Sequence, residues 1–283
     1  MYYLNLIPFM VKNKKSIYWP GLSMNPNAIS LLEQNPNRIN WFYLSRNKNA
    51  INLLEQNQDK IDWGMLSLNE HPRAIGMLEQ NQDKIDWHML SSNPNAICLL
   101  EKNHNKIDWN MLSMNPNAIH LLKQNSKKIN WKNMSLNRSS EAIHLLEQNM
   151  NKICWIFLSR NSNPRAVHIL EQNMDKIYWC QISENSGAFH LIEQNPKKID
   201  WVRLSLNEHP GAIHLLEKNK TKIWWAELSE NPAIFQYNYD TYDTMKKHMY
   251  DSGLAEQLMQ NRFHPRNLDK FEGWGFDSIL NEK

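Results

Sequence analysis

Tryptophan recurs along this chain at intervals of 22 or 24 residues, and this spacing constrains the fold more than any other feature. The sequence between successive tryptophans is nearly the same each time, as in "NPNAISLLEQNPNRINW" from Asn25 and "NPNAIHLLKQNSKKINW" from Asn115. A unit this short cannot bury an apolar face alone and must stack on its neighbours. The ten tryptophans that keep this spacing are Trp19, Trp41, Trp63, Trp87, Trp109, Trp131, Trp155, Trp179, Trp201 and Trp225.

Two residues are the only variation in unit length, and they always enter at the same place. The shorter units read "NPNAI", as at 25–29, where the longer ones read "NEHPRAI", as at 69–75. Two extra residues inside a helix would rotate everything beyond them by about 200° and bury the wrong face. The insertion point is therefore predicted to be a loop. Nine complete units begin at Asn25, Asn47, Asn69, Asn93, Asn115, Asn137, Asn161, Asn185 and Asn207.

Each unit is predicted to form two short helices. The stretch 28–32 places its apolar residues on one helical stripe, so we expect a first helix of about ten residues. Asn25 and Pro26 resemble an N-cap and a first-turn proline, and Asn35 suits a left-handed residue that ends the helix. A second helix, α-helical or partly 3₁₀, is expected around Trp41, with Asn40 as its cap.

The fold class predicted from these patterns is all-α: an α-solenoid of nine two-helix repeats with terminal caps. We expect a degenerate capping repeat at 1–24, the solenoid at 25–230 and a C-terminal helical cap at 231–283. Without that cap the last repeat would expose an apolar face. Met245, Met249, Leu254, Leu258 and Phe263 suggest two helices in the cap, interrupted at Gly253.

Residues that recur in register have structural interpretations. The Trp, Leu, Ile and Ala positions are expected to form the continuous core. The recurring Ser and Asn, such as Ser23 and Asn25, are expected to satisfy backbone groups in the loops between units. A catalytic residue should depart from the repeat, and none stands out.

A basic position and an acidic position also recur in almost every unit. Opposite charges in neighbouring rows favour an ion-pair lattice on the surface, although the basic row by itself could follow a phosphate backbone. The basic row is Arg38, Lys60, Lys84, Lys106, Lys128, Lys152, Lys176, Lys198 and Lys222; the acidic row is Glu33, Glu55, Glu79, Glu101, Glu147, Glu171, Glu193 and Glu217.

Two sets of variable positions are candidate partner contacts. One is a histidine row in five successive units, whose alternatives are a tolerant polar surface position or a metal chain. Neighbouring helices roughly 8–10 Å apart hold such side chains too far apart to share zinc. The other set follows the tryptophans, where partial burial would explain the same residues. The candidates are His120, His144, His168, His190, His214, Phe42, Tyr43, Met65, Met89, Met111 and Phe157.

Composition excludes several function classes. Lys and Arg total 32 against 29 acidic residues, which disfavours general attraction to nucleic acid or lipid. Three cysteines without paired spacing predict neither disulfides nor a zinc site. The chain lacks phosphate-loop, HExxH and GxSxG motifs, so we expect no enzyme, no cofactor and no metal. The N-terminal apolar run is too short for a membrane span and has no signal-peptide order, which predicts an intracellular protein.

The repeat string, followed by "FHPRNLDKFEGWG" near the C-terminus, resembles uncharacterised repeat proteins of giant DNA viruses of protists. That resemblance implies a viral product in the host cytoplasm or the virion and supplies no activity. A looser architectural likeness is to leucine-rich-variant solenoids. Together the patterns predict a monomeric, non-enzymatic scaffold that binds a host or viral protein. The alternative is a modular nucleic-acid-binding repeat protein.

Overall fold

The computed structural model describes residues 4–237, 247 and 250–253, and the chain divides into two compact units. One unit is Leu6–Gln236, and the other comprises Met1–Asn5 with Tyr237–Lys283. The five residues on which the predicted C-terminal helices rest, Met245, Met249, Leu254, Leu258 and Phe263, lie outside the described residues. Within Leu6–Gln236 the structure confirms the all-α repeat solenoid.

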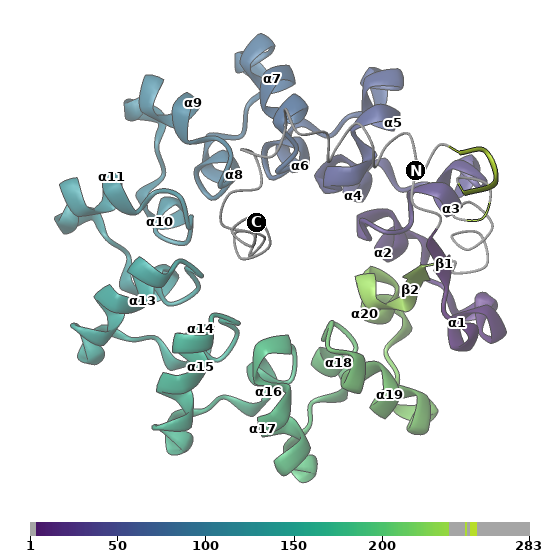
Figure 1. The fold of residues 1–283 in the computed structure, drawn as a ribbon. Helices are drawn as coiled ribbons and strands as arrows, with labels where there is room; N and C mark the ends of the chain where they lie inside the picture. The colour runs from purple at the N-terminus through teal and green to yellow at the C-terminus, as the bar shows by residue number, and fades with distance from the viewer. Residues whose placement is uncertain (1–3, 238–246, 248–249, 254–283) are drawn as a thin grey trace, which may run out of the picture. The chain divides into compact units, whose positions relative to one another are not determined.

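The solenoid closes into a ring, with one circle of helices inside another (Figure 1). The inner helices begin at the ten tryptophans: α2 (Trp19–Met24), α4 (Trp41–Arg46), α6 (Trp63–Ser67), α8 (Trp87–Ser91), α10 (Trp109–Leu112), α12 (Trp131–Met134), α14 (Trp155–Leu158), α16 (Trp179–Ile182), α18 (Trp201–Leu204) and α20 (Trp225–Glu230).

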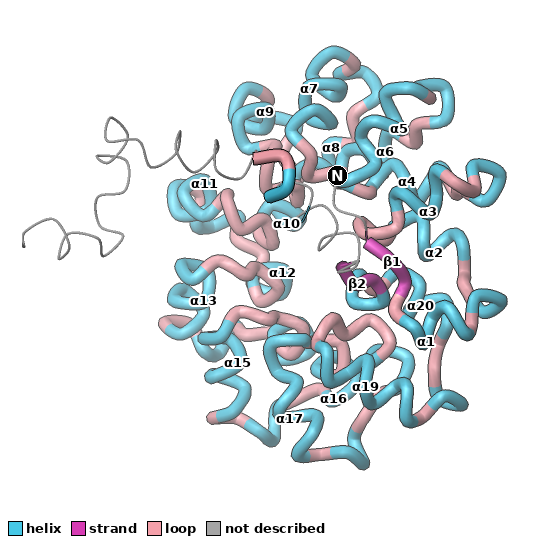
Figure 2. Tube along the Cα trace, turned by 45° about the vertical axis from the view of Figure 1, so that its right-hand side comes forward, coloured by secondary structure: helices cyan, strands magenta, loops and turns pink. Residues whose placement is uncertain are grey.

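The outer helices alternate with them: α1 (Pro8–Lys12), α3 (Ile29–Glu33), α5 (Ile51–Gln56), α7 (Pro72–Gln80), α9 (Ile97–Lys102), α11 (Ile119–Gln124), α13 (Ser140–Glu147), α15 (Pro164–Glu171), α17 (Phe189–Gln194) and α19 (Pro210–Lys218). Figure 2 shows the same alternation from an oblique direction.

The two-residue insertion lies in a loop, as predicted, and it lengthens the outer helix that follows. In the 24-residue units this helix has eight or nine residues, as in α7 and α13. In the 22-residue units it has only five or six, as in α3 and α5. The expectation of about ten residues was therefore too long for the shorter units. In the shorter units, the residues that would form the first turn of the outer helix belong to the preceding loop.

A 3₁₀ segment that the sequence did not predict joins each outer helix to the next inner helix. These are η1 (Lys14–Ser16), η2 (Pro36–Arg38), η4 (Gln58–Lys60), η5 (Gln82–Lys84), η6 (His104–Lys106), η7 (Ser126–Lys128), η8 (Met150–Lys152), η9 (Met174–Lys176), η11 (Pro196–Lys198) and η12 (Lys220–Lys222). Three others, η3 (Lys48–Ala50), η10 (Ser186–Ala188) and η13 (Pro232–Ile234), follow inner helices.

The residue before each connecting segment does not adopt the left-handed conformation predicted for it. Asn35 has φ −133°, and its side-chain amide donates to the Leu31 carbonyl oxygen at 2.9 Å. Among the described residues only Gly253 has positive φ. Asn35 therefore ends its helix through a side-chain bond. The predicted cap of the inner helix is confirmed, since Asn40 accepts a hydrogen bond from the Tyr43 amide.

Two rows of buried polar residues connect each unit to the next, as predicted. The Ser ladder is Ser23, Ser45, Ser67, Ser91, Ser113, Ser135, Ser159, Ser183, Ser205 and Ser229; the Asn ladder is Asn25, Asn47, Asn69, Asn93, Asn115, Asn137, Asn161, Asn185, Asn207 and Asn231. All of them are at most 2% exposed. Because buried peptide groups need partners, these bonds fix the position of each unit on its neighbour.

Asn47 shows the pattern that the Asn ladder follows. Its amide donates to the carbonyl oxygens of Ser23 and Asn25 in the preceding unit, at 3.0 and 2.9 Å. Its own oxygen accepts from the Asn49 amide, which turns the loop. Asn25 was expected to be a helix N-cap, but Ala28 occupies that place before α3. The Asn ladder thus joins units and does not cap the outer α-helices, although Asn47, Asn185 and Asn231 cap the 3₁₀ helices η3, η10 and η13.

The seam between α2 and α20 uses the same bonds. Asn25 donates to the carbonyl oxygens of Ser229 and Asn231 at 3.1 and 2.8 Å, and the Tyr18 amide donates to the Ser229 hydroxyl at 2.9 Å. The sequence predicted an open apolar face after the last repeat; the structure shows that the first unit covers it. The strands β1 (Leu4–Leu6) and β2 (Phe235–Tyr237) pair in a two-stranded sheet.

Leu, Ile and Ala form the core, but the tryptophans do not. Leu44, Leu66, Leu90 and their equivalents are fully buried, whereas every repeat Trp is only half-buried. Their indole rings form part of the surface. The prediction that the Trp row belongs to the core was therefore wrong, because the ring needs only one covered face at this position.

Candidate functional site

Three cavities open at the centre of the ring, where each inner helix ends and the Asn ladder begins. The first has a volume of about 540 Å³, the second about 370 Å³ and the third about 120 Å³. Their walls come mainly from the two residues on either side of each ladder asparagine, such as Arg46 and Lys48 around Asn47. Because every unit presents this point to the centre, distant units line one cavity.

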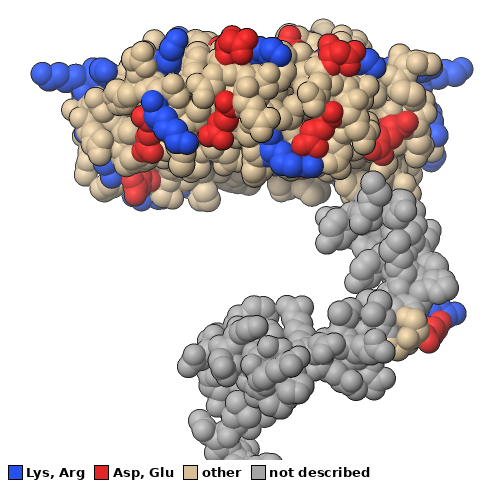
Figure 3. Space-filling model, turned by 90° about the horizontal axis from the view of Figure 1, so that it is seen from above, with Lys and Arg blue, Asp and Glu red and all other residues tan. Residues whose placement is uncertain are grey.

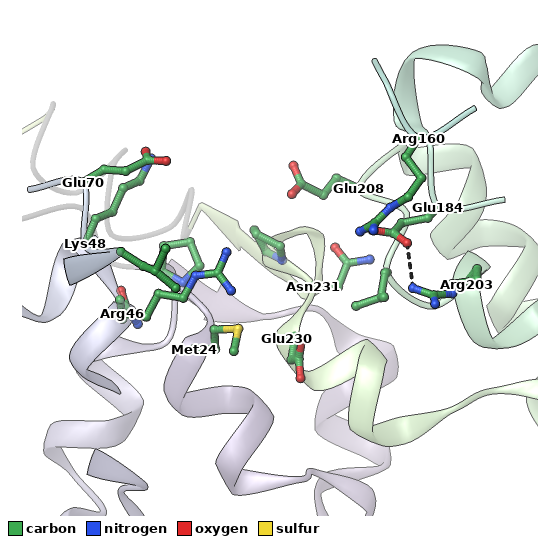
Figure 4. A pocket seen from close by; sticks show the side chains of 15 residues that line it. Met24, Arg46, Lys48, Glu70, Arg160, Glu184, Arg203, Glu208, Glu230 and Asn231 are labelled. Atoms are coloured by element: carbon green, nitrogen blue, oxygen red, sulfur yellow. Dashed lines mark hydrogen bonds and ion pairs between the residues drawn. The ribbon is translucent and has the colours of Figure 1, made fainter. Parts of the chain in front are cut away.

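Arg46 and Arg160 divide the first cavity from the second. Both side chains line both cavities, and they enter from opposite sides of the ring (Figure 4). Arg46 is the last residue of α4, and Arg160 lies two residues after the end of α14. Two guanidinium groups thus line the centre of the ring, at the ends of inner helices fixed by the Ser and Asn ladders.

The first cavity balances its charges. Glu184 accepts hydrogen bonds from Arg160 at 2.9 Å and from Arg203 at 3.0 Å. Burial raises the pKa of Glu230, and nearby Glu227 raises it further, while Arg46 opposes the increase. The first cavity therefore contains one fully paired carboxylate and one whose ionisation is disfavoured.

The cavity-lining positions vary from unit to unit, while the ladders beside them are constant. The residue before the ladder asparagine is, in order, Met24, Arg46, Leu68, Ser92, Met114, Leu136, Arg160, Glu184, Leu206 and Glu230. This variation, between an invariant Ser and an invariant Asn, was the available signal for the site. It was missed because the sequence does not show that these positions face a common centre.

The predicted contacts that follow the tryptophans lie on the inner helices. Phe42 is 45% exposed, whereas Tyr43, Met65, Met89, Met111 and Phe157 are half-buried. Phe42 packs edge-on against Tyr43, with ring centroids 5.2 Å apart. Partial burial by neighbouring units accounts for the methionines at these positions. Their role in partner binding remains a prediction.

The five predicted histidines are exposed on the outer helices. His120 contacts Glu101 of the preceding unit at 2.9 Å, and His190 contacts Glu171 at 2.8 Å. His144 and His168 each lie 3.4–3.5 Å from a glutamate on their own helix. His214 is exposed as well. The structure places four of these imidazoles, all but that of His214, beside glutamates and not beside one another. Their use by a partner remains a prediction.

The basic row does not form the predicted lattice with the acidic row. Eight of its nine members, all but Lys106, lie over tryptophan rings of the preceding unit, as Lys128 does at 4.2 Å from the centre of Trp109. The glutamates pair elsewhere, for example Glu55 with Arg73 at 2.9 Å. The lattice prediction was wrong because the 3₁₀ segment places these cations over indole rings. The same contact is made at Trp19, Trp41, Trp63, Trp131, Trp155, Trp179 and Trp201.

The described part of the chain contains no group of three His, Cys, Asp or Glu side chains that could hold a metal ion. Its three cysteines, Cys98, Cys154 and Cys180, are free thiols in different units. Burial raises the pKa of Cys180, and a hydrogen bond with Asp200 adds to the effect. None of the helices that the structure describes has the length and hydrophobicity that a bilayer crossing requires.

Comparison with known proteins gives one family match. No curated protein and no solved structure matches the chain. The family model described as periplasmic copper-binding protein (NosD) matches residues 66–250. The side chains described here do not fit copper, because the imidazoles are separated by whole units and face glutamates. The match nevertheless spans about two thirds of the sequence, and on that extent the chain belongs to the NosD family.

Proposed function

We propose that this protein is a non-enzymatic binding ring that holds a partner protein at its central opening. The observation that carries the proposal is the position of the unit-to-unit variation. Met24, Arg46, Leu68, Glu184 and the other residues before the Asn ladder differ in charge and size, and they line the central cavities. A scaffold that needs only to stack could repeat one residue there. A surface that binds a partner protein, whose side chains differ from one position to the next, needs different residues in different units.

Closure of the ring supports a monomer. The face that an open solenoid would leave bare is covered across the seam, since α2 packs on α20. A second copy is therefore not needed to bury an end. The resemblance of the repeat string to giant-virus proteins supports a viral product, with a host or viral protein as its partner.

The alternative, nucleic-acid binding, has weaker support. The basic row lies over the indole rings, and the ring surface seen in Figure 3 interleaves Lys and Arg with Asp and Glu. A phosphate backbone would favour an uninterrupted positive track. An interleaved surface provides none on this face.

The test is a capture experiment with the full chain immobilised and a nuclease-treated extract of infected host cells. The cavity variant is Arg46→Ala with Arg160→Ala, and the control is Lys220→Ala, which removes an exposed cation from η12. We expect a specific protein to bind the wild type and the control but not the cavity variant. An identical set of proteins on all three baits, or binding that depends on intact nucleic acid, would overturn the proposal.

A further inference from the structure

The second cavity differs from the first in its charge. The first is lined by four cationic side chains and four carboxylates, so its charges balance. The second is lined by Arg46, Arg138 and Arg160 but by a single carboxylate, Glu70. Arg160 is already paired with Glu184, which leaves the charges of Arg46 and Arg138 against this one carboxylate. This part of the opening therefore has a positive potential, which attracts anions.

Two of these arginines form no salt bridge with the described residues. Arg160 pairs with Glu184, whereas Arg46 acts on the Glu230 carboxyl only from beyond ion-pair distance and Arg138 has no described carboxylate within that distance. Arg138 follows Asn137 of the Asn ladder, and its carbonyl oxygen accepts from the Asn163 side chain. Its backbone is therefore fixed while its guanidinium remains available. A guanidinium in this situation binds a carboxylate or phosphate through paired hydrogen bonds.

Much of the remaining lining of the second cavity is apolar. It comprises Leu68, Met114 and Leu136, together with Pro94 and Pro116. A free phosphate ion or a nucleic-acid backbone would engage the arginines and leave these apolar side chains in water. A peptide that carries acidic and apolar side chains near each other would engage both kinds of lining residue. The gain comes from buried apolar area and from charge-assisted hydrogen bonds.

We propose that the second cavity binds an acidic segment of a partner protein, with Asp or Glu on Arg46 and Arg138 and an apolar side chain against Leu68, Met114 and Leu136. This inference rests on the proposed function and adds to it the chemistry of the partner. The occupant is a peptide segment, since a lining that contains both arginines and apolar side chains matches neighbouring side chains of one chain.

The test is selection of a displayed library of random twelve-residue peptides on the full-length protein. We expect the enriched peptides to combine Asp or Glu with Leu, Met or Phe. The best peptide is then synthesised with a fluorophore and titrated by fluorescence polarisation. Because attraction between charges is screened by salt, its affinity should fall as ionic strength rises.

Matched variants assign the binding to this cavity. Arg138→Gln should weaken the peptide on the order of tenfold, as expected for loss of one charge-assisted hydrogen-bonding partner. Lys220→Gln, which also removes one positive charge, should leave affinity unchanged. Leu136→Ala should weaken the peptide as well, and circular dichroism checks that each variant is folded.

Three results would overturn the proposal: enriched peptides without an acidic bias, equal affinity in Arg138→Gln, or displacement of the peptide by millimolar inorganic phosphate alone. The last result would mean an anion pocket with no use for the apolar wall. If the capture experiment still finds a partner that depends on Arg46 and Arg160, the proposed function survives and only the acidic chemistry fails. If the capture experiment fails while the peptides bind, the proposed function falls instead.

Discussion

The seam and the contact between α8 and α10 are made by the same bonds but covered by different side chains. In the ordinary contact, Asn115 donates to the Ser91 and Asn93 carbonyl oxygens. At the seam, Asn25 does the same with Ser229 and Asn231, which are 204 and 206 residues away in sequence. Closure therefore needs no special cap. The first unit packs on the last one through the same ladder hydrogen bonds that every other unit forms with the unit before it.

The differences at the seam lie around its tryptophan and its carboxylates. The unit that follows Trp225 around the ring has Ser16 where the others have a cation, and Phe9 stacks on Trp225 at 5.8 Å instead. Gly21 lies so close that an added Cβ would be 2.8 Å from the Ala226 carbonyl oxygen. One Glu227 carboxylate oxygen is buried without a hydrogen-bond partner. The seam thus combines close packing at Gly21 with one unsatisfied buried carboxylate oxygen.

The largest effect is expected from deleting one unit, residues 115–136. An open solenoid would tolerate this deletion, because it joins two equivalent surfaces. A closed ring must divide its full turn among fewer units, and interfaces fixed by buried hydrogen bonds resist the extra curvature. We expect the ring to open at the seam. Hydrogen exchange at the Tyr18 amide, which Ser229 protects, measures this; retained protection would show that the units bend freely.

Removing one ladder asparagine compares the two kinds of contact. Asn115→Ala and Asn25→Ala each remove two hydrogen bonds. Each leaves one buried carbonyl oxygen, of Ser91 or of Ser229, unpaired, because the carbonyls of Asn93 and Asn231 also accept from the Ala96 and Ile234 amides. An unpaired buried group costs about 1–3 kcal/mol. Asn115→Ala, which lies between two ordinary units, should lower the unfolding free energy of the whole ring. Asn25→Ala, which lies at the seam, should open the ring with less effect on the remaining units. Hydrogen exchange resolved by unit separates these outcomes, and equal spread of exchange in both variants would contradict the comparison.

Gly21→Ala tests the close approach at the seam. The new methyl group would meet the Ala226 carbonyl oxygen, which belongs to backbone and cannot move aside easily. We expect destabilisation of about 1–3 kcal/mol from overpacking. Gly76→Ala is the control, since nothing lies within 4 Å of its added Cβ, and alanine favours a helix by about 1 kcal/mol. Thermal melts should shift in opposite directions; a neutral Gly21→Ala would mean that the seam is loose.

The indole contacts provide a smaller test. Lys128→Met removes the cation over Trp109, and we expect a loss of about 0.5–1 kcal/mol, as for an exposed cation–π pair. Because Trp109 is only half-buried, Trp109→Ala should cost less than the 3–5 kcal/mol of a fully buried aromatic. Denaturant melts of both variants, and of the double variant, give the coupling between them. No coupling would mean that the contact contributes nothing to stability.

The repeat unit was predictable from sequence, but the closure of the ring was not. Invariant Ser and Asn predicted buried partners for loop backbone, and the bonds of Asn47 confirm it. Curvature, however, is the sum of small rotations between units, and the residue pattern does not determine these rotations. For the same reason the cavities could not be predicted: Arg46 and Arg160 belong to different units, and they line one cavity only because the ring closes. The periodicity predicts that one face of the Trp41 ring is covered, but it does not show whether the other face is covered as well.

The smallest effect concerns Glu230 at the seam, and it depends on pH. Burial and Glu227 raise the pKa of Glu230 above its ordinary value, so the folded ring prefers the protonated carboxyl. Its ionisation therefore lowers the unfolding free energy at neutral pH. That loss is recovered as pH falls through the raised pKa toward the ordinary one. Glu230→Gln removes the charge and should stabilise the protein slightly at pH 7 but not at pH 4. The difference between the two melting curves across this range measures the effect, and Glu33→Gln, on the exposed outer helix α3, serves as the control. A difference that stays constant with pH would show that the Glu230 charge has no net effect on stability. A Glu230→Gln variant that is destabilised at pH 7 but not at pH 4 would show that the charge is favourable at the seam, through Arg46.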